Sequence, residues 1–135
     1  MKKKSPANVM NLVTMCMAIL AVSIVVMVYL QCTELLLIKL EVSQVSRKYI
    51  LKMETEGYLT PENQKELLLE LKELGIKNIE LSGTTLNPVA YGDTIVLWIK
   101  GNIQANMIKQ DEVWNGETDI RLLELEEKRM STAKN

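Results

Sequence analysis

The side chains of this chain that could do chemistry are few, and their types exclude most catalytic mechanisms. The 135-residue sequence contains no histidine and only two cysteines, Cys16 and Cys32. Histidine is the usual proton shuttle near neutral pH, and histidine and cysteine supply most zinc ligands and thiol nucleophiles. We therefore expect no enzymatic activity, no metal site and no cofactor.

Neighbouring acids are the remaining candidates for acid–base chemistry. They form two pairs, Asp111-Glu112 and Glu126-Glu127. Neighbours on a strand point to opposite faces of a sheet, so neither pair would converge into a carboxylate dyad. The glycine and two threonines at residues 83–85 lack the glycine and lysine spacing of a phosphate-binding loop. The pattern favours association over catalysis.

An uncharged apolar run from Val9 to Leu30 indicates where in the cell the chain is located. A helix of about 20 apolar residues, rising about 1.5 Å per residue, crosses the hydrocarbon core of a bilayer. A secretory signal peptide would have a shorter apolar region and a small-x-small cleavage site, and a lipoprotein would have small residues before its cysteine. Neither pattern is found at Cys16 or Cys32. We predict an uncleaved, single-pass transmembrane helix over residues 9–30.

Orientation follows from Lys2, Lys3 and Lys4, which precede the run without any acid. Positive residues beside a span stay cytoplasmic, so residues 1–8 are predicted to be a cytoplasmic basic tip and the C-terminal portion to be extracytoplasmic. That portion carries all 17 acidic residues of the chain and is net negative. The expected partner is therefore the lipid bilayer of the cell membrane, and nucleic acid is not expected.

The helix is predicted to continue beyond the membrane as an amphipathic stalk over residues 31–56. No proline or glycine occurs in this segment, and Gly57 offers a C-terminal cap. Apolar residues recur at the 3–4 spacing of one helical face. The predicted packing stripe of the stalk is Leu35, Ile38, Val42, Val45 and Tyr49.

A small α+β domain is predicted over residues 57–130. Thr60 and Pro61 are typical of a helix start, and Gly75 ends that short helix. Residues 76–82 and 94–103 have the alternation of strands, with a loop over 83–93 between them. Residues 119–127 fit either a third strand or a short helix, after a turn at Asn115-Gly116.

The fold class that follows is α+β, with the long N-terminal helix packed on a small antiparallel sheet of about three strands plus one short helix. Residues 131–135 are predicted to be a loose tail. The predicted sheet core is Ile79, Leu81, Ile95, Leu97 and Ile99.

This arrangement resembles the type IV pilins, and more closely the TadE-like minor pilins of the tight-adherence system of Gram-positive bacteria. The resemblance rests on residues 44–49 (QVSRKY), residues 83–85 (GTT) leading to Pro88 and to residues 91–93 (YGD), and residues 131–134 (STAK). It implies a pilin-like, non-enzymatic subunit of a surface pilus, secretion or conjugation apparatus. Partners would be other pilin-like subunits or assembly platform proteins, with a homo-oligomer as a further possibility.

The chain departs from processed prepilins in one respect. No glycine occurs before position 57 and no acid before Glu34, whereas prepilins are cut after a glycine and carry a glutamate soon afterwards. The pattern therefore favours a minor or permanently membrane-embedded component. The alternative is a bitopic membrane scaffold of the cell-division type, in which the stalk stripe forms a coiled-coil seam.

Overall fold

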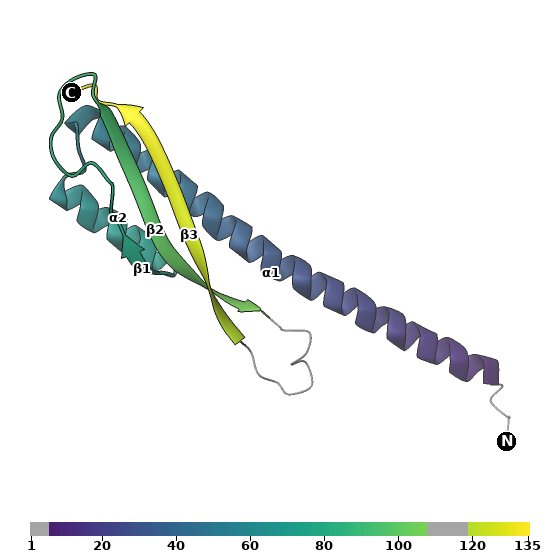
Figure 1. Ribbon diagram of the computed structural model, residues 1–135. Coiled ribbons are helices and arrows are strands. Elements are labelled where there is room, and N and C mark those ends of the chain that lie inside the picture. Colours follow the sequence, from purple (N-terminus) through teal and green to yellow (C-terminus); the bar gives the residue numbers. More distant parts are fainter. Residues whose placement is uncertain (1–5, 108–118) are drawn as a thin grey trace. The chain divides into compact units, whose positions relative to one another are not determined.

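The computed structural model of this chain describes residues 6–107 and 119–135. Lys2, Lys3 and Lys4, the pair Asp111-Glu112 and the predicted turn at 115–116 lie outside the described residues. Figure 1 shows a long helix, a short helix and a sheet, which confirms the predicted α+β class. The elements are α1 (Pro6–Glu56), α2 (Pro61–Glu73), β1 (Ile76–Glu80), β2 (Thr94–Met107) and β3 (Asp119–Thr132).

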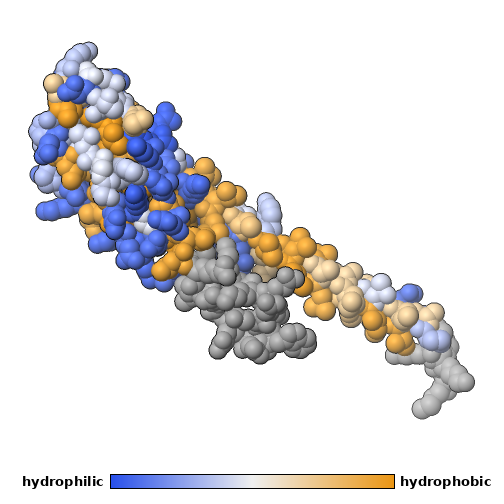
Figure 2. All heavy atoms as spheres, in the orientation of Figure 1, coloured by the Kyte–Doolittle hydropathy of each residue, from blue (hydrophilic) through white to orange (hydrophobic). Residues whose placement is uncertain are grey.

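The chain divides into two compact units, Met1–Leu35 and Leu36–Asn135. The described part of the first unit is α1 alone, and its apolar side chains over residues 9–30 are all exposed. In Figure 2 they form a nearly continuous apolar surface along that part of the helix. Its length and composition are sufficient to cross a membrane, which is compatible with a single-pass anchor.

In the second unit, the remainder of α1 is amphipathic. The helix ends at Glu56 because Gly57 adopts a left-handed φ of 79°. The Gly57 amide donates to the Met53 carbonyl oxygen at 2.7 Å. One face of this part of α1 is buried, and its residues recur at helical spacing. They are Val42, Ser46, Tyr49, Ile50 and Met53.

Helix α2 has the start and stop that its sequence predicts. The Thr60 hydroxyl accepts a hydrogen bond from the Asn63 amide, and Pro61 occupies the first turn. Leu67 and Leu71, one turn apart, are fully buried. Gly75, at φ 82°, ends the helix and leads directly into β1.

The sheet has the order β1-β2-β3, and both pairings are antiparallel. The β2–β3 ladder runs without a break from the pair Thr94–Thr132 to the pair Met107–Asp119. Residues 119–127, which the sequence left open between strand and helix, are therefore strand. The ladder also includes Ser131 and Thr132, so the prediction of a loose tail was wrong for these residues.

The inner face of the sheet, turned toward the core, is supplied mainly by β2. Ile95, Leu97 and Ile99 have no exposed surface, in keeping with the alternation of that strand. Ile79 and Leu81, which were also predicted in the core, are only half-buried. The reason is an irregularity in β1, where the register shifts between Lys77 and Glu80 and Asn78 takes a left-handed φ of 52°.

Gly101 allows this irregular strand to lie close to β2. A Cβ at position 101 would lie 2.4 Å from Cγ2 of Ile76 and 3.3 Å from the Lys77 carbonyl oxygen. Ile76, the buried residue of β1, is only 2% exposed. The space that a side chain would fill at position 101 is therefore occupied by Ile76, which is why Ile76, rather than Ile79, belongs to the core.

We predict that Gly101→Ala lowers the free energy of unfolding by about 1–3 kcal/mol, the usual cost of overpacking. Ile76 is β-branched and stiff at χ1, so its methyl group cannot easily turn away. Denaturant unfolding of the detergent-solubilised protein, followed by circular dichroism, measures the change. In the double variant with Ile76→Ala, the new methyl group fills part of the space left by Ile76. The loss of unfolding free energy in the double variant should therefore be smaller than the sum of the losses in the two single variants. Strict additivity would contradict this account of Gly101.

Candidate functional site

A polar contact between α1 and β3 lies beside the apolar core. Arg129 of β3 donates from Nε to the hydroxyl of Ser46 and from Nη2 to the hydroxyl of Ser43, both at 2.6 Å. Its guanidinium also lies 3.2 Å from the carboxylate of Glu127. Ser46 has no exposed surface, and its hydroxyl finds its hydrogen-bond partners within the chain. The helix is thus fixed to β3 by directional bonds and to β2 by apolar packing.

A second polar contact joins α1 to α2. Glu70 of α2 accepts a hydrogen bond from the Tyr49 hydroxyl at 3.0 Å and forms an ion pair with Lys48. Lys52 lies 3.0 Å from the carboxylate of Glu66, and its ammonium lies 4.9 Å from the centre of the Tyr49 ring. The contact therefore combines a buried aromatic ring with charges at its rim.

The pKa values at this contact are shifted by burial and by hydrogen bonding. Burial, and then the hydrogen bond to Glu70, raises the pKa of the Tyr49 hydroxyl. Burial alone would raise the pKa of the Glu70 carboxyl, but hydrogen bonds from Lys48 and Tyr49 outweigh it and lower that pKa. Both shifts favour the state in which Tyr49 is neutral and Glu70 is ionised, which is the state that keeps the hydrogen bond between them.

The last residues of the chain are held against the end of α1. Glu54 accepts hydrogen bonds from the Ser131 hydroxyl and from Lys134 Nζ, the latter at 2.7 Å. The Lys134 amide donates to the Glu54 carbonyl oxygen, and Ala133 is 1% exposed. The hydrogen bonds from Lys134 and then from Ser131 lower the pKa of the Glu54 carboxyl. We call residues 131–135 and Glu54 the C-terminal clamp.

The threonines of the loop before β2 have a structural role. The Thr84 hydroxyl accepts from the Trp98 amide and donates to the Trp98 carbonyl oxygen, each at 3.0 Å. The Thr85 amide donates to the Val96 carbonyl oxygen, and its hydroxyl accepts from the Val96 amide. These bonds cover the edge of β2 beyond the end of β1. The loop therefore continues the sheet edge.

The outer face of the sheet, turned away from the core, is mostly polar, although Leu122 and Met130 are also exposed on it. Trp98 lies there with its indole Nε1 2.7 Å from the Glu126 carboxylate. Ammonium groups of Lys100 and Lys128 lie 4.2 and 4.5 Å from the centre of the Trp98 ring. Gly83 leaves space for that ring, because a Cβ at position 83 would lie 2.6 Å from it.

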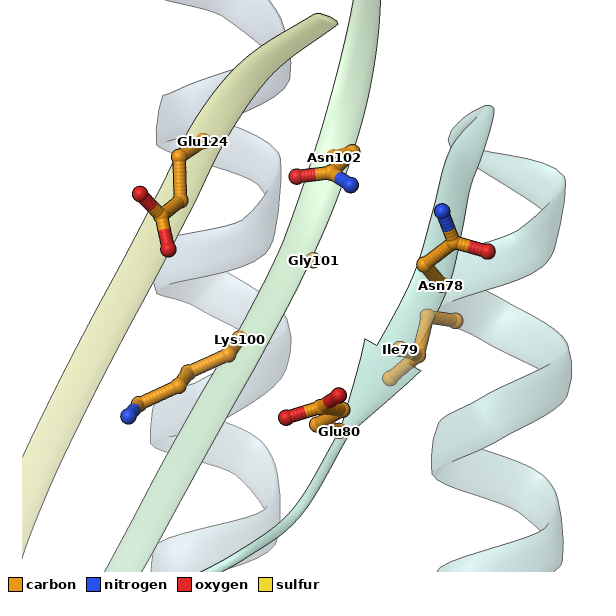
Figure 3. A pocket seen from close by; sticks show the side chains of 7 residues that line it. All are labelled: Asn78, Ile79, Glu80, Lys100, Gly101, Asn102 and Glu124. Carbon is orange, nitrogen blue, oxygen red and sulfur yellow. The ribbon is translucent and has the colours of Figure 1, made fainter.

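A hollow on this face is lined by residues of all three strands. In Figure 3, side chains of Glu80, Lys100 and Glu124 line it together with amide side chains. The register places Glu80 opposite Lys100, and Glu124 opposite Asn102. The side chains of Asn78, Glu80 and Glu124 are exposed to solvent. Within residues 6–107 and 119–135, no group of three or more metal-ligating side chains converges on a common point.

The predicted stalk stripe is divided between buried and half-buried positions. Val42 and Tyr49 are buried in the second unit, whereas Leu35, Ile38 and Val45 are half-buried. The prediction missed three buried positions of α1, which are Ser46, Ile50 and Met53. Ile50 and Met53 continue the 3.6-residue periodicity from Val42 and could have been found by extending that spacing. The same spacing places Ser46 on this face, but nothing local indicates the distant partner, Arg129, that allows a polar serine to be buried there.

Comparison with known proteins leaves the family open. No family model, curated protein or solved structure matches this chain.

We predict that the C-terminal clamp makes the protein less stable in acid. A lowered pKa of Glu54 adds stability above the ordinary glutamate pKa of about 4.3, and this stability is lost as the pH falls through the lowered value. Thermal unfolding between pH 7 and pH 3 tests the sign. Glu54→Gln and Lys134→Gln should both lower Tm at pH 7, and the gap between each variant and the parent should narrow toward pH 3. Parallel curves would contradict a role for Glu54 ionisation.

We predict that Arg129→Met lowers the free energy of unfolding by about 1–3 kcal/mol, because it removes two charge-assisted hydrogen bonds to α1. Lys128→Met, one residue earlier on the outer face, is the matched control and should cost about 1 kcal/mol or less. Denaturant unfolding measures both. Equal costs would show that the bonds to Ser43 and Ser46 add nothing to the packing of the helix.

Proposed function

We propose that this chain is a non-enzymatic, pilin-like subunit of a surface pilus, secretion or conjugation apparatus, anchored in the cell membrane by the first part of α1. The observation that carries the proposal is the difference in exposure between the two parts of one helix. Residues 9–30 of α1 are apolar and exposed, whereas residues 42–53 provide buried side chains to a small antiparallel domain. The same element thus serves as anchor and as part of a domain core.

The polar contacts of the second unit support a structural role. The ion pairs and hydrogen bonds at Arg129, Glu70 and Glu54 each join two elements of the fold. We propose that the anchor keeps the N-terminal tip in the cytoplasm and presents the second unit outside it, where it contacts other subunits or an assembly platform.

The scaffold alternative needs the stalk stripe as a seam between helices. Val42 is 1% exposed and Tyr49 has no exposed surface within this single chain. Both side chains therefore already have partners in their own domain. A coiled coil through these residues would require the domain to open, which makes the scaffold function the weaker candidate.

Purification of the tagged full chain from its native membranes tests the proposal. We expect other single-pass subunits, and an assembly ATPase or polytopic platform protein, to be recovered with it and identified by mass spectrometry. A deletion of residues 58–135 should still fractionate with membranes through α1 but lose these components. A strictly monomeric full chain with no co-purifying subunits would overturn the proposal. Full retention of partners and function by the truncated chain would favour the scaffold.

A further inference from the structure

Three leucines on the outer part of α1 are left exposed. Leu36, Leu37 and Leu40 have exposed fractions of 62%, 52% and 59%. At about 100° per residue they lie within about 100° of one another around the helix. We call these three residues the outer leucine face. Its members adjoin one another, unlike the isolated apolar side chains that are common on protein surfaces.

The outer leucine face is turned away from the rest of its own domain. By the same helical geometry its centre lies about 140° around α1 from the centre of the buried face, which includes Val42, Tyr49 and Met53. A sliding of the sheet and α2 along α1 would therefore not cover it. Among the described residues, none outside α1 is placed to cover it, so a partner from outside the chain can reach it.

Lipid alone is a poor cover for this face. Leu36 and Leu40 follow the end of the apolar run at Leu30 by six and ten residues, which is roughly 9 and 15 Å of helical rise. The headgroup layer on each side of the hydrocarbon core is only about 5–8 Å deep. The outer leucine face extends beyond that layer, so a protein surface is the better partner.

Charges on the two sides of the face indicate which protein surface fits. Lys39 and Glu41 are both exposed, and they lie on opposite sides of the outer leucine face. When two copies anchored in one membrane pack their α1 helices in parallel, a two-fold axis brings Lys39 of each copy toward Glu41 of the other. Their heights on the helix differ by only about 3 Å, which long side chains can span.

We infer that the outer leucine face binds a second copy of this chain, forming a parallel pair of α1 helices just outside the membrane with Lys39–Glu41 pairs on both sides. This inference rests on the proposed function, because it names one subunit that the membrane-anchored component contacts. Arg47 limits the contact, since it lies near the same helical face as Leu36 and two arginines would repel each other across the axis.

Cysteine cross-linking of the full chain in membranes tests the pairing. In a background with Cys16→Ala and Cys32→Ala, Leu40→Cys should give a disulfide-linked dimer on mild oxidation. Leu69→Cys on α2, where the leucine is 61% exposed, is the matched control and should give at least several-fold less dimer. Equal cross-linking at both positions, or cross-links from position 40 only to a different protein, would overturn the inference.

Charge reversal distinguishes pairing of two copies from burial of the outer leucine face in lipid, because lipid burial would not depend on the signs of Lys39 and Glu41. Lys39→Glu should reduce the Leu40→Cys dimer several-fold, because it places like charges opposite each other, and Glu41→Lys should do the same. Combining both reversals should restore the dimer. A double variant no better than the single variants would overturn the inference.

Mass spectrometry of the same preparations separates this inference from the proposed function. If other subunits are still recovered while the position 40 dimer is absent, the inference that a second copy binds this face is wrong and the proposed function stands. If the dimer forms and no other subunit is recovered, the inferred pairing stands and the proposed function is wrong.

Discussion

A three-stranded sheet must cover one apolar face, and in this protein α1 provides much of that cover. Ile95, Leu97 and Ile99 of β2 would be exposed to water without the packed helices. Val42, Tyr49 and Met53 of α1 lie in the same core, so the helix whose first part is long and apolar enough to span a membrane is also part of the domain. The bonds of Arg129, Glu70 and Glu54 then fix the register of the other elements against that helix.

Sequence periodicity predicted the elements whose signals are local. The end of α1 at Gly57, the cap of α2 at Thr60 and the alternation of β2 each depend on residues a few positions apart. Residues 119–127 differ, because their leucines fit a helix or a strand equally well. Their conformation is decided by hydrogen bonding to β2, which is a long-range contact.

The positions that sequence reasoning missed depend on distant partners. Ser46 resembles a surface residue of an amphipathic helix, yet it is buried because Arg129 satisfies its hydroxyl. Ile79 follows the strand alternation but loses its core position to Ile76, since Gly101 leaves space for a bulged strand. For the candidate function, sequence could identify a helix able to span a membrane and a packing stripe. It could not say which part of that stripe the chain uses for its own core.

The C-terminal clamp also sets an order of events during synthesis. Lys134 contacts Glu54 across 80 positions of sequence, and β3 is the last strand to be made. All of α1 emerges first, with Val42, Tyr49 and Met53 still lacking the strands that cover them. The domain cannot close completely until Lys134 has been added to the chain. During that interval the apolar side chains of the unfinished chain are exposed to water or to a chaperone.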